Sequence, residues 1–209
     1  MPVCSFFRAR LSLVAFALLL CAGASRLPAD DEGEGWVTLF NGKDLTGWSA
    51  TEGVEWKIED GAIITPPKRS HLFTNQEFTN FHFKAEVMTT PGSNSGIFFH
   101  SQPEDNWPSI GYETQINNTH KDPVKTGSIY YVVKLYEPAV AKDNEWWTHE
   151  VIVKGKNIVI KVNGKTVVDY TEPEGVTSPH RLGKGKFALQ AHDPESVVKY
   201  RNIRVKPLP

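Results

Sequence analysis

FHFKAEVM, residues Phe81 to Met88, alternates two kinds of side chain along its whole length. The odd-numbered residues are all apolar, whereas the even-numbered positions carry His, Lys, Glu and Met. Successive side chains of a strand point to opposite faces of a sheet, so this period of two predicts a strand with one face in the core and one toward solvent.

Similar short runs continue in both directions from this segment, with turn residues between them. Dipeptides that accept positive φ and close two-residue hairpins follow three of the runs, at Asn41-Gly42, Asp60-Gly61 and Asn163-Gly164. The other predicted strands are Ile97–His100, Tyr112–Ile116, Ile129–Leu135, Glu150–Lys154, Thr166–Tyr170, Lys186–Ala191 and Val197–Val205. Because no long run beyond the N-terminal segment has helical apolar spacing, the sequence predicts an all-β fold of two packed antiparallel sheets.

The N-terminal segment has the layout of a secretory signal. Arg8 and Arg10 precede an apolar run from Leu11 to Leu20, and the small residues 22–24 follow as a cleavage site requires. The run is too short for a bilayer that needs about 20 residues, so no transmembrane helix is expected. Residues 1–24 are therefore predicted to be a signal peptide, which implies a secreted or periplasmic protein, with envelope association as an alternative.

The rest of the chain is predicted to be an acidic linker, residues 25–35, and one domain, residues 36–209. Both cysteines, Cys4 and Cys21, precede these segments, so the mature chain has no disulfide and no cysteine metal site. Lipid attachment at Cys21 is the alternative, although Leu20 stands where lipoprotein processing requires a small residue.

Charge excludes a dedicated nucleic-acid binder. The 209 residues contain 23 Lys and Arg against 24 Asp and Glu, a formal net charge of −1. Such a chain has no excess positive field with which to hold a phosphate backbone. Nothing in the sequence fixes the oligomeric state.

Polar pairs spaced by two occur on otherwise apolar predicted strands. The spacing puts the two members of each pair on one face: Glu113 with Gln115, Gln190 with His192, and Phe98 with His100. If the strands share a sheet, they form a polar floor of one carboxylate, two imidazoles and two amides, suited to a polyhydroxylated ligand and to acid/base chemistry. Outward-facing polar residues of an ordinary sandwich surface are the alternative reading.

Aromatic residues lie on or beside these pairs. They are Trp107, Trp146, Trp147, Tyr130 and Tyr131. Aromatic rings stack on sugar faces, although they are also common in cores and at sheet edges. Three longer Pro-rich segments, Thr65–Ser70, Gln102–Ile110 and Thr171–Gly185, are candidate loops at the rim of a cleft.

The whole mature chain resembles one family. The opening GWVTLFNGKDLTGW, residues 35–48, resembles the signature of secreted domains first catalogued without a function and now described as 3-keto-disaccharide hydrolases. The resemblance continues in WKIEDGAI (56–63), SNSGIFF (93–99), GYETQI (111–116), TGSIY (126–130), VNGKTVVD (162–169), LQAH (189–192) and YRNIRVK (200–206). It implies a concanavalin A-like jelly roll whose concave sheet holds an active site for cleaving glycosides that carry a ketone at C3.

The resemblance also implies a chemistry and residues for it. A ketone at C3 acidifies the C2 hydrogen, so that a base removes it and the C1 glycosidic oxygen leaves; direct hydrolysis is the alternative. Glu113 and His192 are the implied base and acid, or the ligands of a divalent metal ion that stabilises the enediolate. The binders of an oxidised sugar or glycoside that the resemblance implies are Gln115, Gln190 and Tyr130. The spacing of the polar pairs adds His100 as a candidate, and the nearby aromatic residues add Trp107 and Trp146.

Two other classes of function stay open at this point. A non-catalytic carbohydrate-binding module would use the same sandwich, because a fold does not fix a function. A structural domain of the cell envelope would leave the polar pairs pointing to unrelated places.

Overall fold

The computed structural model describes Met1, residues 33–104 and residues 106–209. The predicted signal peptide and most of the predicted acidic linker therefore lie outside the described residues. The described residues form thirteen strands and no helix, and so contain no helix that could span a membrane.

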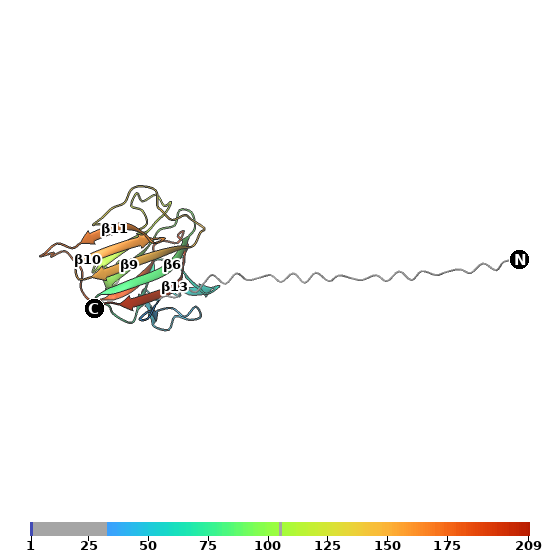
Figure 1. Ribbon diagram of the computed structural model, residues 1–209, viewed down its shortest axis with the longest axis horizontal. Coiled ribbons are helices and arrows are strands. Elements are labelled where there is room, and N and C mark those ends of the chain that lie inside the picture. The colour runs from blue at the N-terminus through green and yellow to red at the C-terminus, as the bar shows by residue number, and fades with distance from the viewer. Residues whose placement is uncertain (2–32, 105) are drawn as a thin grey trace. The chain divides into compact units, whose positions relative to one another are not determined.

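All pairings between neighbouring strands are antiparallel, and the strands form two sheets (Figure 1). One has eight strands in the order β11-β10-β9-β6-β13-β4-β3, with β1 also paired to β13, and the other has five in the order β2-β5-β12-β7-β8. The bounds are β1 Val37–Thr38, β2 Trp48–Ala50, β3 Lys57–Glu59, β4 Ala62–Ile64, β5 Ser70–Thr74, β6 Phe81–Thr89, β7 Ser95–Ser101, β8 Tyr112–Ile116, β9 Trp147–Lys154, β10 Asn157–Val162, β11 Lys165–Thr171, β12 Lys186–Ala191 and β13 Val198–Pro207. The predicted two-sheet jelly-roll sandwich is confirmed.

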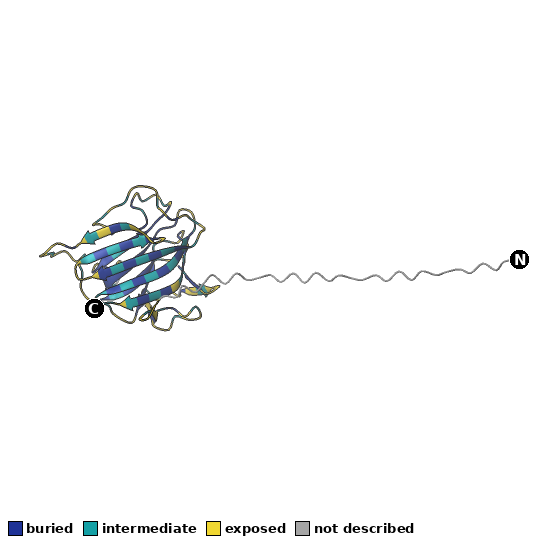
Figure 2. Cartoon of the chain, in the orientation of Figure 1, coloured by how far each residue is buried: buried dark blue, intermediate teal, exposed yellow. Residues whose placement is uncertain are grey.

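The core lies between the sheets. The odd residues of β6 are buried and the even ones partly exposed, so the alternation predicted for Phe81–Met88 is confirmed (Figure 2). Rings from opposite sheets meet there, with centroids 6.0 Å apart for Phe81 and Phe99 and 4.6 Å apart for Phe83 and Phe187. Edge-to-face and tilted contacts of this kind stabilise a core beyond the area they bury.

Four strands of the five-stranded sheet, β5, β12, β7 and β8, are buried on both faces. All residues of β5 and β7 are buried, and nearly all of β8 and β12, whereas β6, β9 and β10 alternate. A second layer of side chains and loops therefore covers the face turned away from the core. This covered face of the five-stranded sheet carries the candidate site.

Two of the three predicted hairpin turns close hairpins. Asp60-Gly61 joins β3 to β4 and Asn163-Gly164 joins β10 to β11, and all four residues have positive φ, as type I′ turns require. The third prediction is wrong, because Asn41-Gly42 is followed by β2, which pairs with β5 and not with β1. The Asn41 side chain instead accepts hydrogen bonds from the amides of Lys43 and Asp44, in a local turn.

The strand predicted at Ile129–Leu135 is also wrong. The segment makes only isolated bridges, and the amides of Val132 and Val133 both donate to the carbonyl of Ile129 in a tight turn. Tyr131 has a φ of 68° at this turn. The left-handed conformation reverses the chain and leaves the Tyr131 ring exposed.

Candidate functional site

The floor of the site is a row of polar side chains across β8, β7 and β12. Glu113 and Gln115 come from β8 and Gln190 from β12, with β7 between them. The middle strand contributes Gly96, which pairs with Gln115. A Cβ at Gly96 would lie 2.7 Å from Cγ and Cδ of Glu113, so this glycine leaves the space that the carboxyl group occupies.

Glu113 is held as a neutral acid at ordinary pH. Burial raises its pKa to about 8, the negative charge of Asp122 acts in the same direction, and the hydrogen bond from Gln190 opposes them. Gln190 Nε2 donates to Glu113 Oε1 at 3.3 Å. With Oε1 accepting this bond, the carboxyl proton belongs on Oε2, where it can be donated to a ligand.

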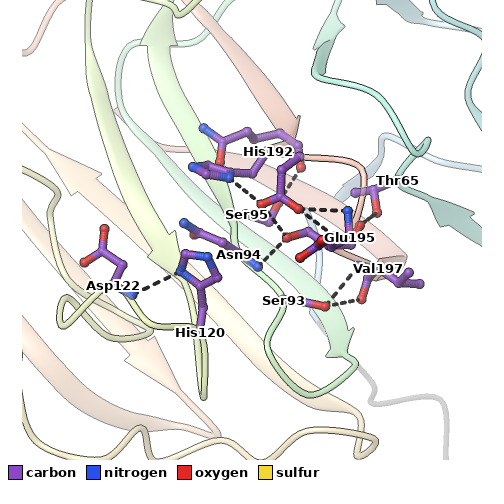
Figure 3. Close-up of polar contacts among 12 residues, drawn as sticks. Thr65, Ser93, Asn94, Ser95, His120, Asp122, His192, Glu195 and Val197 are labelled. Carbon is purple, nitrogen blue, oxygen red and sulfur yellow. Dashed lines mark hydrogen bonds and ion pairs between the residues drawn. The ribbon is translucent and has the colours of Figure 1, made fainter.

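His192 follows β12 and is oriented by the next residue in the chain. Its Nδ1 lies 2.7 Å from Asp193 Oδ2, and Asp193 also accepts from the backbone amides of Glu195 and Ser196 (Figure 3). Burial opposes the ionisation of Asp193, but the bonds from His192 and Ser196 outweigh it and lower the pKa of this carboxyl group. The carboxylate fixes the proton of a neutral His192 on Nδ1, so Nε2 is left as a base.

Two amides and a phenol complete the polar surroundings. Gln115 Nε2 donates to Asn94 Oδ1 at 2.9 Å, which leaves the NH₂ group of Asn94 as a donor. Tyr130 donates its hydroxyl to Asp122 Oδ2 at 3.0 Å. Burial, with Asp122 beside it, raises the pKa of Tyr130 to about 12, so the phenol stays neutral.

Aromatic rings form the walls and the rim. Trp107 is 41% exposed, and its ring centroid is 5.3 Å from that of His192. Tyr131 is exposed and stacks on His180, with centroids 5.2 Å apart and planes at 21°. Trp107 belongs to the predicted rim loop Gln102–Ile110 and His180 to the rim loop Thr171–Gly185, so two of the three candidate loops reach the site.

Together these groups enclose one cavity, here called the central cavity. The space that it encloses, counted out through its open mouth, is about 690 Å³. It is lined by Asn94, Phe98, Trp107, Pro108, Gly111, Glu113, Gln115, Tyr130, Tyr131, His180, Gln190 and His192. Six of the eight residues proposed from the sequence therefore meet in one place.

His100 does not reach the central cavity, although its spacing from Phe98 predicted that it would. A β-bulge interrupts the pairing of β7 with β12 at this point, and His100 has a φ of 54°. The bulge turns the imidazole toward the Phe81 ring, where Nε2 meets the carbonyl of Thr79 at 2.7 Å and Nδ1 accepts from the amide of Gly183. Burial lowers the pKa of His100, and the residue is part of the fold's interior.

Trp146 is also away from the central cavity. It precedes β9 in the eight-stranded sheet, and the guanidinium carbon of Arg201 lies 4.0 Å from its ring centroid. Arg201 in turn donates to Glu86 on β6. The tryptophan is thus packed by a cation–π contact within the other sheet and does not line the central cavity.

The donor set does not fit a resident divalent cation. Among the described residues, no three His, Cys, Asp or Glu side chains gather closely enough to hold a metal ion. Glu113 and His192 alone are fewer ligands than a protein metal site uses.

The sequence reasoning missed several residues of the site, of which Gly96, Asn94 and Asp193 matter most. Gly96 had a usable signal, because a glycine inside a strand marks a close approach of other atoms. Asp193 had one too, since a carboxylate next to a candidate catalytic histidine is a natural partner for its ring. Asn94 had none, because it precedes β7 and its direction depends on the loop.

The family comparison covers nearly all of the described domain. A model of the 3-keto-alpha-glucoside-1,2-lyase-like domain matches residues 35–206. A 3-keto-disaccharide hydrolase of Bacteroides thetaiotaomicron is 24% identical over 178 residues, which are 69% of this chain and 61% of that protein. The chain thus spans less than two thirds of the length of this curated relative.

Solved structures are similar in fold. A Parabacteroides distasonis protein, provisionally described as a glycosyl hydrolase, superposes with a TM-score of 0.74 at 25% identity, covering 88% of this chain and 98% of its own. A carbohydrate-binding module of Bacillus subtilis gives a TM-score of 0.59 at 13% identity, covering 77% of this chain and 95% of its own. At that identity the second likeness concerns the fold alone.

Proposed function

The chain belongs to the 3-keto-alpha-glucoside-1,2-lyase-like domain family, and on this premise we propose that it cleaves the glycosidic bond of glycosides oxidised to a ketone at C3. The family and its relatives make it a carbohydrate-active, hydrolase-like domain. One observation carries the finer proposal: a neutral carboxyl group and a carboxylate-oriented imidazole both line the central cavity.

The two groups suit the two demands of enolisation. His192 Nε2 takes the proton from C2, and the C–H electron pair forms a C2–C3 double bond while the ketone oxygen gains negative charge. The Glu113 carboxyl group donates a hydrogen bond to that oxygen, as a neutral acid in an apolar site can. Glu113 can act in this way at neutral pH because its pKa of about 8 keeps the proton in place.

Cleavage follows from the enolate. Its electron pair re-forms the C3 carbonyl, C1 and C2 become doubly bonded, and the C1–O bond breaks. The departing oxygen takes the proton that His192 holds. Water added later across the C1–C2 double bond gives the free 3-keto sugar, so elimination and net hydrolysis share the same first steps.

The test is aglycone release by purified protein from a 3-keto-glucoside and from the unoxidised glucoside. We expect release only from the keto substrate, and a loss of about 10³-fold or more in kcat for His192→Ala, because the base is removed. Asp193→Asn should lose less, since it keeps the imidazole but misorients it. Equal turnover of the oxidised and unoxidised glucosides, or full activity of His192→Ala, would contradict the proposal.

A non-catalytic carbohydrate-binding module is the second candidate function, because the exposed rings of Trp107 and Tyr131 at the rim could stack on a sugar without chemistry. Binding of that kind depends on Trp107 and not on His192. Calorimetric titration of Trp107→Ala and His192→Ala with a disaccharide, together with the release assay, distinguishes the two functions. A binding module should lose affinity in Trp107→Ala, keep it in His192→Ala and release no aglycone.

We also propose that the protein acts outside the cytoplasm. The signal-like segment of residues 1–24 supports this, and sugar cleavage fits an extracellular or periplasmic place. N-terminal sequencing of the protein exported by its host would test it, with a mature start near Ser25 expected and a retained Met1 contradicting it.

A further inference from the structure

A second depression adjoins the central cavity on the side of His192. It is formed mainly by the connection between β8 and β9 and is here called the His120 groove, with His120, Lys121, Pro123, Lys134 and Tyr136 along it. Asn94, Tyr130 and His192 line both the groove and the central cavity. The two spaces therefore adjoin at these three side chains.

The groove is built from a firmly bonded loop. Asn117 is buried, its Nδ2 donates to the carbonyls of Asp122 and Val124, and its Oδ1 accepts from the amide of His120. Lys125 Nζ donates to the carbonyls of His120 and Asp122 from the other side. These bonds fix the loop without a ligand, so the groove is preformed.

His120 presents a defined donor in this groove. Its Nδ1 accepts from the amide of Asp122 at 3.1 Å, which puts the proton of the neutral ring on Nε2. Its ring stands edge-on to that of His192, with centroids 5.9 Å apart. Figure 3 shows both imidazoles and the Asn94 side chain directed toward the same space.

The position of His192 decides which part of a substrate enters the groove. The proposed reaction needs one group that reaches the glycosidic oxygen, and that oxygen lies between the oxidised sugar and its aglycone. His192 is such a group, since it faces both spaces. The enclosed cavity holds Glu113, which must meet the C3 ketone, so the aglycone extends on the other side of His192.

We propose that the His120 groove is the aglycone subsite and takes the second sugar ring of a 3-keto-disaccharide, a reading that rests on the proposed function. Tyr136, which is 62% exposed, offers a ring face for stacking. His120 Nε2 and the ammonium groups of Lys121 and Lys134 offer donors to sugar hydroxyls. Because this groove is open where the cavity is enclosed, the aglycone is selected less strictly than the oxidised sugar.

The test compares a methyl 3-keto-glucoside, which ends at the glycosidic oxygen, with a 3-keto-disaccharide. In Tyr136→Ala and Lys134→Ala we expect kcat/KM for the disaccharide to fall about tenfold, and kcat/KM for the methyl glycoside to stay within about twofold. Tyr131→Ala is the matched control, because Tyr131 lines the central cavity but not the groove. This variant should lower kcat/KM for both substrates by the same factor. Equal losses for both substrates in the groove variants would overturn the proposal.

A binding arm separates this proposal from the proposed function. Calorimetry with an unoxidised disaccharide and with methyl glucoside needs no turnover. The proposal predicts that the wild-type protein binds the disaccharide more tightly than methyl glucoside, and that Tyr136→Ala removes this difference. That result would support the groove even if the wild-type protein cleaved neither keto substrate. In that case only the proposed reaction would fail. Equal affinity for the two sugars would overturn the groove whatever the outcome of the cleavage assay.

Discussion

Glu113 shows how a single residue's surroundings choose its chemical role. A carboxyl group in water is ionised at neutral pH, but burial raises the pKa of Glu113 to about 8. At pH 7 about nine tenths of such a group is protonated. Under the proposed function, Glu113 is then a hydrogen-bond donor to the developing enolate, and His192 is the base.

This reasoning predicts the alkaline side of the pH profile. Since the protonated form of Glu113 is required, kcat/KM should fall about tenfold for each pH unit above about 8. Tyr130 does not titrate there, because its pKa is about 12. In Glu113→Gln, whose amide keeps an N–H donor, we expect activity about 10²-fold lower and no alkaline decline below pH 9.5.

A pH profile that rises through pH 8 would reverse the roles of Glu113 and His192. If kcat/KM of the wild type rises through pH 8 and Glu113→Gln is inactive, Glu113 is the base and His192 the acid. Measuring both enzymes on the same methyl 3-keto-glucoside between pH 5.5 and 9.5 decides between the two assignments. Asp122, His192, Tyr130 and Tyr200 are titratable groups near this carboxyl group, and all four are unchanged in the variant.

Strand β7 shapes the site because Gly96 has no side chain. Gly96 leaves a gap into which Glu113 leans from β8, toward Gln190 on β12. In Gly96→Ala, the new Cβ would lie 2.7 Å from Glu113 Cδ, so the carboxyl group must move off Gln190. We expect kcat/KM to fall about 100-fold or more while the melting temperature changes by only a few degrees, because alanine suits a strand better than glycine.

The control for this variant is Gly183→Ala. A Cβ at Gly183 meets nothing within 4 Å, and this glycine has no positive φ. Circular dichroism should give this variant a melting temperature close to that of wild type, and the release assay a similar kcat/KM. A fully active Gly96→Ala would mean that the position of the Glu113 carboxyl group is unimportant.

The elements also show where sequence reasoning succeeds and where it stops. Spacing by two correctly placed Glu113 with Gln115 and Gln190 with His192, because β8 and β12 are regular there. It failed for His100, where Gly111 and Gly185 make room for a bulge: a Cβ on either would lie 2.7 Å from the His100 carbonyl oxygen. Bulges depend on packing between strands, which a period of two does not encode.

Strand β5 was missed for a related reason. SHLFT, residues 70–74, is buried on both faces, so it carries no alternation of polar and apolar residues. The Ile129–Leu135 segment shows the converse, since its strand-like composition is overridden by the turn at Tyr131. Composition and spacing therefore identified the sandwich, whereas contacts made after the sheets form determine its irregular parts.

At the scale of the whole molecule, both layers of the sandwich bury histidines. His149 of β9 lies between the sheets with Nε2 3.0 Å from Thr114 Oγ1, and His71 of β5 is buried beside Trp107. Burial lowers the pKa of both to about 4, with the positive charge of Arg69 adding to the effect at His71. Both rings are therefore neutral in the fold and charged in the unfolded chain below about pH 6.5.

The sign of the resulting pH dependence follows from proton counting. Between pH 6.5 and 4 the unfolded chain binds more protons at these two histidines, so each removes about 1.4 kcal/mol of stability per pH unit as the pH falls. Glu113 acts in the opposite direction from its usual pKa of 4.5 up to about 8, because there the folded state holds the extra proton. The two histidines outweigh the one glutamate, so these three groups together make the fold acid-sensitive below pH 6.5.

His149→Gln isolates one of these contributions. At pH 7.5 the variant should be less stable than wild type by about 1–3 kcal/mol, because a buried ring that fills the core is lost. As the pH falls below 6.5, that deficit should shrink by about 1.4 kcal/mol per unit, since glutamine has no charge to desolvate. Urea unfolding of the variant and of wild type, followed by tryptophan fluorescence at pH 7.5, 5.5 and 4.5, measures this difference in the free energy of unfolding. A deficit in His149→Gln that is the same at all three pH values would show that His149 is not held neutral by the sandwich.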